Sequence, residues 1–386
     1  MTEQPTFETW DDVDLNRGLL RGIHSMGFER PSPIQKQAIL PIISKRDVLA
    51  QAQSGTGKTG AFCISAIQLC DDTLPTSQAI ILSPTRELAQ QTHGVFKALS
   101  SHTKLKSQLL IGGTSVDRDI RDIEKERPQV FVGCPGRVLD FLERGVIQAP
   151  DIRLIVLDEA DEILSSGFQA QLKLIFQFMT IEVQTVMFSA TIPEELHDLV
   201  KKIMRDPIEI LVKAEKLSLD GIAQYYINFR HDDDKLSALK DLYEGISLSQ
   251  SIIYCNSVRQ VEKLYTALRK DNFPVCCIHS EMSREERSEA FQDFKSGNKR
   301  VLISSNVTAR GIDVQQVSIV VNYDVPSCVH NYLHRIGRSG RWGRKGAAIN
   351  FVTDTRVDVD RMKMIESHYG TEIKPLPVNF ADLLTS

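Results

Sequence analysis

Short apolar runs alternate with longer amphipathic segments along most of the chain, and the alternation occurs twice. In the first half the strand-like runs are Val48–Ala50, Ala79–Ser83, Val130–Gly133, Leu154–Leu157 and Thr185–Ser189. In the second half they are Ser251–Cys255, Val275–His279, Arg300–Ser304, Ile319–Asn322 and Gly346–Phe351. Helical patterns such as Val258–Arg269 and Arg284–Phe294 lie between them. Short buried runs that alternate with helices predict an α/β fold with parallel sheets and right-handed crossovers.

The alternation breaks near residues 212–222, where the sequence is charged and has no apolar face. We therefore predict two α/β domains, in residues 1–212 and 223–386, joined by a linker at 213–222. The chain has 386 residues, which at about 150 residues per domain is enough for two separate hydrophobic cores.

Composition changes this picture only at the level of partners and compartment. The formal net charge is -4, which argues against a strongly basic nucleic-acid binder. The seven cysteines are odd in number and form no CxxC pair, so we expect free thiols in a reducing compartment. The polar start of the chain and the lack of any apolar run near 18 residues predict no leader and no membrane span.

The first predicted strand runs into a glycine-rich segment, AQSGTGKT at 52–59, and then into an apolar helix. Gly55 and Gly57 allow positive φ, so that backbone N–H groups can converge on a phosphate at the helix N-terminus. Lys58 can reach the β- and γ-phosphates, and the Thr59 hydroxyl can bind Mg²⁺. The alternative is a solvent loop with a chance GKT. The residues that would surround the nucleotide are Ser54, Gly55, Thr56, Gly57, Lys58 and Thr59.

A phosphate loop of this kind needs an acidic partner at the end of another strand. Asp158 follows the apolar run Leu154–Leu157 and is expected to hold Mg²⁺. Glu159 beside it could orient and deprotonate an attacking water. The alternative, acidic residues at a helix N-terminus, fits Asp161 better than Asp158. The two elements together predict a nucleoside triphosphatase.

Asp158-Glu159-Ala160-Asp161 spells the name of the DEAD-box RNA helicases, and the chain resembles that family from Trp10 to its end. The family form of the phosphate loop begins with alanine, as here at Ala52. The segment GFERPSPIQ at 27–35 resembles the adenine-reading element, in which Gln35 would bond the adenine edge. The resemblance implies that Trp10 stacks on the base; the alternative is a core aromatic.

The resemblance also implies roles at the ends of other strands. The Ser189-Ala190-Thr191 segment resembles the element that couples hydrolysis to domain closure. HRIGRSGRWGRKG at 334–346 resembles the element whose Arg338 and Arg341 act as arginine fingers, with His334 contacting the coupling element. In ARGID at 309–313, Asp313 would hold the ribose and Arg310 would brace the cleft.

The RNA-binding elements of the family map onto both halves of the chain. The matching residues are Pro84, Thr85, Arg86, Gly112, Gly113, Pro135, Gly136, Arg137 and Asn256. Glycine N–H groups, hydroxyls and arginines contact phosphates, which carry no base information, so the resemblance implies sequence-independent binding. Such a grip is compatible with an acidic chain and predicts weak RNA binding without ATP. The glycine pairs could alternatively be ordinary turns.

Three positions depart from the family pattern. Cys134 replaces a threonine before Pro135, and Asn306 replaces an aspartate. Ser305 stands for a more usual threonine. Loss of the hydroxyl and of the charge puts the tightness of an RNA-bound closed state in question.

The resemblance therefore implies two RecA-like domains that bind ATP, Mg²⁺ and single-stranded RNA, and an ATP-dependent RNA helicase. The PVNFADL tail and the short termini resemble the branch of the eukaryotic translation initiation factor 4A, which implies translation initiation, a protein scaffold or regulator as partner, and a cytoplasmic location. The alternative is an ATP-gated RNA clamp in exon-junction or ribosome-biogenesis complexes, in the nucleus or nucleolus. The sequence carries no oligomer signal, so we expect a monomer.

Overall fold

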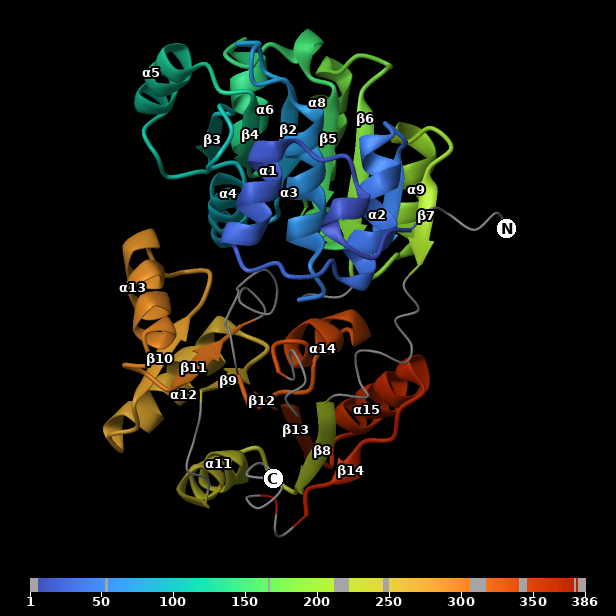
Figure 1. Ribbon diagram of the computed structural model, residues 1–386. Helices are drawn as coiled ribbons and strands as arrows, with labels where there is room; N and C mark the ends of the chain where they lie inside the picture. Colours follow the sequence, from blue (N-terminus) through green and yellow to red (C-terminus); the bar gives the residue numbers. More distant parts are fainter. Residues whose placement is uncertain are drawn as a thin grey trace. The chain divides into compact units, whose positions relative to one another are not determined.

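The computed structural model divides into two compact units, one within residues 1–212 and one within 213–386 (Figure 1). The structure describes residues 6–52, 55–165, 167–211, 222–245, 250–305, 317–339, 346–377 and 380. Each unit is an α/β domain with its own sheet and its own cores. The predicted fold class is confirmed.

The sheet of the first unit is parallel throughout its described pairs, in the order β3-β4-β2-β5-β6-β1-β7. Its strands are β1 (Val48–Gln51), β2 (Ala79–Leu82), β3 (Ser107–Leu110), β4 (Val130–Gly133), β5 (Leu154–Asp158), β6 (Gln184–Ser189) and β7 (Ile208–Leu211). The central strands are buried along their whole length, as expected for strands covered on both faces.

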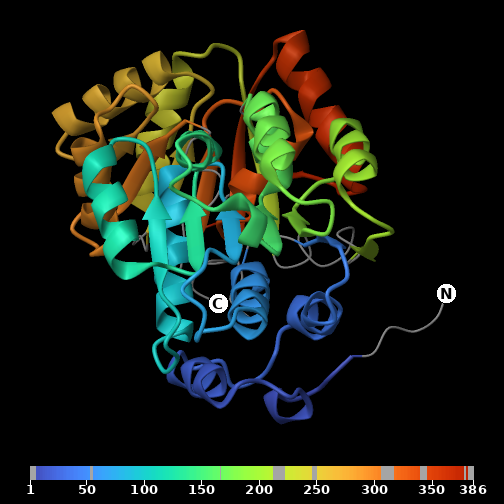
Figure 2. The same cartoon turned by 90° about the horizontal axis from the view of Figure 1, so that it is seen from above.

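Helices cover both faces of this sheet, because alternate strand residues point to opposite sides. Ile81 packs under the first four helices and Ile80 under the later ones. Figure 2 shows the blue helices on one side of the sheet and the green helices on the other. The helices are α1 (Arg17–Ser25), α2 (Pro33–Ile43), α3 (Lys58–Leu69), α4 (Arg86–Leu99), α5 (Val116–Glu126), α6 (Pro135–Glu143), α7 (Ala160–Ser165), α8 (Gln169–Phe178) and α9 (Glu194–Ile203), with 3-10 turns at Trp10–Asp12 and Ala149–Asp151.

The second unit repeats the same architecture with the order β10-β11-β9-β12-β13-β8-β14. Its strands are β8 (Ile222–Phe229), β9 (Ser251–Tyr254), β10 (Val275–Ile278), β11 (Val301–Ser304), β12 (Ile319–Asn322), β13 (Gly346–Thr353) and β14 (Lys374–Pro375). Its helices are α11 (Asp234–Gly245), α12 (Val258–Lys270), α13 (Arg284–Lys295), α14 (Val329–Ile336) and α15 (Arg356–Tyr369). Helices α11 and α12 cover one face, and α13, α14 and α15 cover the other.

Strand order places three sequence motifs of the first unit side by side. The strands β5, β6 and β1 are neighbours, and their carboxyl ends lie at one edge of the sheet. Gln51 is in register with Ser189, and Asp158 with Phe188. The segments that follow these strands therefore meet at one edge, where ligands of open α/β sheets bind.

The predicted strands agree with the structure to within about two residues. The strands β3, β7, β8 and β14 were not predicted from the sequence. Ile222 was assigned to the linker but is the first residue of β8, whereas residues 213–221 lie outside the described part. All seven cysteines are free. In the described ranges no helix is both long and apolar enough to cross a membrane.

Candidate active site

The phosphate loop connects β1 to α3. Gly55 and Gly57 have φ of +83° and +100°, and Gly57 caps the N-terminus of α3. A Cβ on Gly57 would lie 2.6 Å from Ser32 Oγ, so both conformation and space require glycine there. Lys58 and Thr59 begin the helix, as the motif requires. Ser54 lies outside the described residues.

Lys58 reaches across to the residue that follows β5. Its Nζ lies 2.9 Å from Glu159 Oε1, and both side chains are about 5% exposed or less. Glu159 has φ of +49°, a left-handed conformation that costs a non-glycine residue free energy, so the surrounding contacts must hold it. The cluster thus joins the phosphate-loop lysine directly to the DEAD segment.

Asp158 lies at the buried end of β5. Burial, and then the neighbouring Glu159 charge, raise the pKa of its carboxyl to about 7. Its Oδ1 has no hydrogen-bond partner among the described residues. A buried oxygen of this kind, with the Thr59 hydroxyl at the start of α3, suits Mg²⁺, which takes few protein oxygens and completes its shell with phosphates and water. No cluster of three or more His, Cys, Asp or Glu among the described residues could hold a metal alone.

The coupling element is bonded to the DEAD segment. Thr191 Oγ1 donates to Asp161 Oδ2 at 2.7 Å, and the Asp161 N–H donates to Ser189 Oγ at 3.3 Å. Ser189 Oγ in turn donates to the Thr191 carbonyl at 2.6 Å. The Ala190 carbonyl accepts from Gln51 Nε2 of β1 at 3.2 Å. Any shift of the Ser189–Thr191 turn therefore moves Asp161.

Gln35 lies against the phosphate loop. Its Oε1 accepts from the Ser32 N–H at 2.8 Å, which caps α2, and its Nε2 donates to the Gly57 carbonyl at 3.2 Å. Trp10 is only 2% exposed and donates from its indole to the Phe28 carbonyl at 2.8 Å. This burial favours the core alternative for Trp10. A second aromatic residue, Phe28, has a half-buried ring that lies beside Gly60 of α3. Phe28 was not predicted as a site residue.

Arg86 lies over the glycine pair at the end of β3. A Cβ built on Gly112 or Gly113 would lie 3.0 or 3.1 Å from its guanidinium nitrogens. Gly113 also has φ of +87°. Thr85 caps α4 by accepting from the Leu88 N–H. The lack of a side chain at both glycines therefore leaves room for the Arg86 guanidinium.

Arg137 is held by its own unit. Its NH1 lies 2.9 Å from Asp119 Oδ2, its NH2 donates to the Thr114 carbonyl, and both ion-pair side chains are about 90% buried. Thr114 Oγ1 completes the triad by donating to Asp119 at 2.6 Å. These bonds attach the loop that contains the glycine pair to helix α6. Asp119 was not singled out, because its partner lies 18 residues away in the sequence.

Cys134 precedes Pro135 at the N-terminus of α6 and makes no side-chain cap. It packs instead with Ala89 and Ile111, and burial raises the pKa of its thiol to about 12. The thiol therefore behaves as a small apolar side chain. A Cβ built on Gly136 would meet only open space within 4 Å, so no neighbouring group requires glycine there.

In the second unit, the buried guanidinium of Arg335 joins the ends of two strands. Its NH2 donates to Asn256 Oδ1 at 2.8 Å, and its NH1 donates to the Asp324 carbonyl at 2.9 Å and to Asn322 Oδ1 at 3.3 Å. Its charge also lies 5.3 Å from the centre of the Tyr254 ring. Burial lowers the pKa of Arg335 to about 10, which leaves it charged.

Asn256 is bonded by both ends of its amide. Its Nδ2 donates to the Val325 carbonyl at 2.8 Å, while its Oδ1 accepts from Arg335. One turn beyond Arg335, Arg338 is 2% exposed and donates from Nε to the His334 carbonyl at 3.3 Å. His334 is equally buried. The predicted residues Arg310, Asp313 and Arg341, with the departure Asn306, lie outside the described part.

Comparison with protein families decides between the possible triphosphatases. Residues 32–199 match the DEAD/DEAH box helicase family, and residues 234–343 match the helicase conserved C-terminal domain. The chain belongs to the DEAD box helicases. In this DEAD box protein each matched range lies within one of the two units of the fold.

Curated relatives cover the chain almost completely. It is 48% identical to the ATP-dependent RNA helicase eIF4A of Chaetomium globosum, over 98% of this chain and 95% of the relative. It is also 48% identical to the eukaryotic initiation factor 4A of Caenorhabditis elegans, over 98% and 93%.

Solved structures agree. Dbp5 of Saccharomyces cerevisiae bound to RNA and ADP BeF3 matches with a TM-score of 0.89 and 35% identity, over 98% of each chain. Mss116p bound to single-stranded RNA and AMP-PNP matches with a TM-score of 0.85 and 26% identity, over 98% of this chain and 82% of that one. The DEAD box protein thus has the two RecA-like domains that its sequence predicted.

Proposed function

We propose that this DEAD box protein is an ATP-dependent RNA helicase that hydrolyses ATP to unwind or remodel RNA locally during translation initiation. One observation carries the proposal: Lys58 of the phosphate loop and Glu159 of the DEAD segment form a buried ion pair, with Asp158 beside them. Family membership and near-complete likeness to eIF4A helicases support RNA as the polymer that is remodelled.

The residues of this cluster would bind ATP and activate water. Lys58 would leave Glu159 for the β- and γ-phosphates, because a phosphate carries more negative charge than a single carboxylate. Asp158 and the Thr59 hydroxyl would hold Mg²⁺, which neutralises charge on the phosphate oxygens when bound. Glu159, released from Lys58, would then orient the attacking water and accept its proton. Gln35 would bond the adenine edge.

The remaining assigned residues would couple this chemistry to RNA. The Thr191–Asp161 bond supports a role of the coupling element in sensing the DEAD segment. Arg338 and Arg341 would stabilise the charge that develops on the γ-phosphate, with His334 and Arg310 as supports and Asp313 on the ribose.

RNA would be held through its phosphates. Arg86, seated on the glycine pair, supports such a grip, and the segments at 84–86 and 135–137 would add backbone N–H and hydroxyl contacts. Asn256 would act mainly by positioning, because its amide is already bonded within the second unit. Binding would be independent of base sequence.

The pathway and partners rest on the relatives. Two of them are named as eIF4A helicases or initiation factor 4A, so we assign the chain to the same step, with a protein scaffold or regulator as partner and the cytoplasm as its place of action. A neighbour, yeast Dbp5, is bound to another protein, Gle1, in one solved structure. We expect a monomer that acts with such a regulator.

The proposal is tested by ATP turnover of the purified chain with and without single-stranded RNA. RNA should raise the turnover, and Glu159→Gln should lower it at least about 100-fold, because the general base is lost while the side chain keeps its size. The variant should still bind ATP and RNA together.

Absence of RNA-stimulated turnover, with ATP-dependent RNA binding intact, would replace the helicase by the RNA clamp. A Glu159→Gln protein that hydrolyses ATP at the wild-type rate would remove Glu159 from the mechanism.

A further inference from the structure

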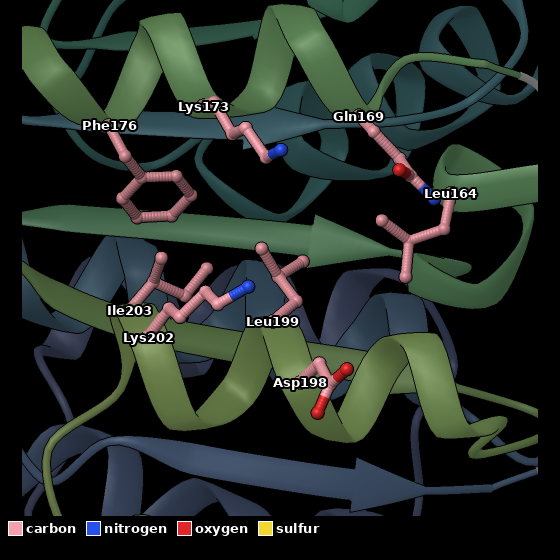
Figure 3. A pocket seen from close by; sticks show the side chains of 8 residues that line it. All are labelled: Leu164, Gln169, Lys173, Phe176, Asp198, Leu199, Lys202 and Ile203. Atoms are coloured by element: carbon pink, nitrogen blue, oxygen red, sulfur yellow. The ribbon is translucent and has the colours of Figure 1, made fainter.

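A groove of about 210 Å³ lies between α8 and α9 of the first unit, with α7 at one end (Figure 3). Its apolar lining comes from Leu164, Phe176, Leu199 and Ile203. None of the residues assigned to ATP or RNA lines it. The volume is below the about 300–1,000 Å³ of typical small-molecule pockets, so it suits an inserted side chain better than a whole metabolite.

Two ammonium groups border the apolar lining. Lys173 of α8 and Lys202 of α9 extend toward the groove from opposite helices (Figure 3). Both side chains are exposed, and neither forms an ion pair with a described residue. With Asp198 as the one acidic residue of the lining, the groove carries net positive charge. An occupant with carboxylates beside apolar side chains is complementary to it.

Three more apolar side chains are exposed on and just after α8, outside the groove. Leu174 and Phe178 on α8 are each 40% exposed, and Ile181 in the following turn is 88% exposed. At about 100° per residue, Leu174 and Phe178 lie on a different side of α8 from Lys173 and Phe176, and Ile181 lies beyond the end of the helix. The lining holds one aromatic ring, Phe176, whereas grooves that bind single-stranded RNA present several aromatic rings to successive bases, which argues against RNA as occupant.

We propose that the α8–α9 groove binds an acidic amphipathic helix of a protein partner. An apolar anchor would enter the groove between Phe176 and Leu199, and carboxylates on either side would pair with Lys173 and Lys202. Among the helices around the groove, α7 carries Asp161 and α9 follows Thr191, so the partner would contact helices that adjoin the bonded Asp161–Thr191 pair.

The test measures binding of a fluorescein-labelled synthetic helix of about 15 residues, with leucines on one face and glutamates beside them, to the full chain without ATP. Lys173→Glu and Lys202→Glu should each weaken binding about tenfold, since an attraction becomes a repulsion. The matched control is Lys201→Glu, an exposed lysine of the same helix that does not line the groove. A probe in which lysines replace the glutamates should bind the double variant, Lys173→Glu with Lys202→Glu, better than it binds the wild type.

Four results would overturn the proposal. One is no saturable binding of the glutamate probe to the wild-type chain, and another is an equal loss in Lys201→Glu. Concentration-dependent self-association that the double variant abolishes would make a second copy the occupant. Loss of single-stranded RNA affinity in the double variant, with unchanged circular dichroism, would make RNA the occupant. Because ATP is absent, failure of the proposed hydrolysis would leave these outcomes unaffected.

Discussion

At the scale of single residues, the active cluster is defined by buried charges that compete with one another. Lys58 neutralises Glu159, whereas the oxygen of Asp158 is left without a hydrogen bond among the described residues. Burial of a carboxylate disfavours its charged form, and the adjacent Glu159 adds to the effect. The Asp158 carboxyl is therefore close to half protonated at neutral pH.

Asp158 should give Mg²⁺–nucleotide binding a pH dependence. With its pKa raised to about 7, the carboxyl is neutral at lower pH and attracts the metal only after it loses its proton. Affinity should rise roughly tenfold per pH unit below 7 and level off above it. The measurement is calorimetric titration at several pH values, with Asp158→Asn as reference for titration of the nucleotide itself. Equal slopes in both proteins would contradict the assignment.

The raised pKa of Asp158 also makes the stability of the folded chain depend on pH. The folded chain holds the Asp158 proton more tightly than the unfolded chain, whose carboxyl titrates near 3.8. This contribution stabilises the folded chain at low pH and is lost as the pH rises from about 4 to about 7. The raised pKa of Asp158 thus lowers the stability of the folded chain at neutral pH relative to acid pH.

Arg335 lies in the segment of the proposed arginine fingers, but we expect it to act mainly by stabilising the second unit. Arg335→Ala would leave Asn256, Asn322 and the Asp324 carbonyl without their donor, at a cost of about 3 kcal/mol in the free energy of unfolding. Arg335→Lys, which keeps the charge but loses the fork, should recover part of it. Urea unfolding followed by circular dichroism measures both, and an alanine variant as stable as the wild type would refute the role.

At the scale of elements, the sequence predicts the buried strands well because their apolar runs are continuous. It fails at the edges: β3 is a half-exposed edge strand with the polar start Ser107-Gln108, and β14 is only two residues long. The strand β8 alternates between buried and exposed positions and follows a charged segment, so its apolar content is diluted. Pairing with β13, which is distant in sequence, stabilises it.

Local motifs predict which residues belong to the site but not which of them touch. The phosphate loop and the DEAD segment are recognisable from spacing, yet the Lys58–Glu159 pair spans 101 residues and depends on strand order. Asp119 has no motif of its own. Trp10 and Phe28 are both aromatic near the adenine element, and only packing distinguishes the buried one from the half-buried one.

The contact between α2 and α3 should control nucleotide affinity. A Cβ on Gly60 would lie 2.6 Å from Gln35 Nε2 and 3.1 Å from the Phe28 ring. Gly60→Ala should therefore displace both side chains and raise KM for ATP at least about tenfold, a loss of some 1.4 kcal/mol of binding, with little change in kcat. Steady-state kinetics with saturating RNA provides both constants.

Gly94→Ala is the matched control, since Gly94 lies in α4 with nothing within 4 Å of an added Cβ. It should leave KM unchanged and stabilise the helix by about 0.5–1 kcal/mol. A normal KM in Gly60→Ala would show that Gln35 does not read the nucleotide.

At the scale of the whole molecule, the two units share one strand order, and only the first has a phosphate loop after its first strand. Residues 1–212 carry 22 Lys+Arg and 28 Asp+Glu, a net charge of -6, whereas residues 213–386 carry 24 and 22, a net charge of +2. The residues proposed for nucleotide chemistry therefore lie mostly in the acidic unit, and the proposed arginine fingers lie in the basic one.

The central claim is that ATP binding and hydrolysis by this chain separate RNA strands. The most direct measurement is the release of a labelled strand from a short RNA duplex by the purified full chain. Strand release should require ATP and should be lost in Lys58→Ala, which removes the phosphate-loop cation. Strand release that is equal with and without ATP, or none while RNA-stimulated ATP turnover proceeds, would contradict the account.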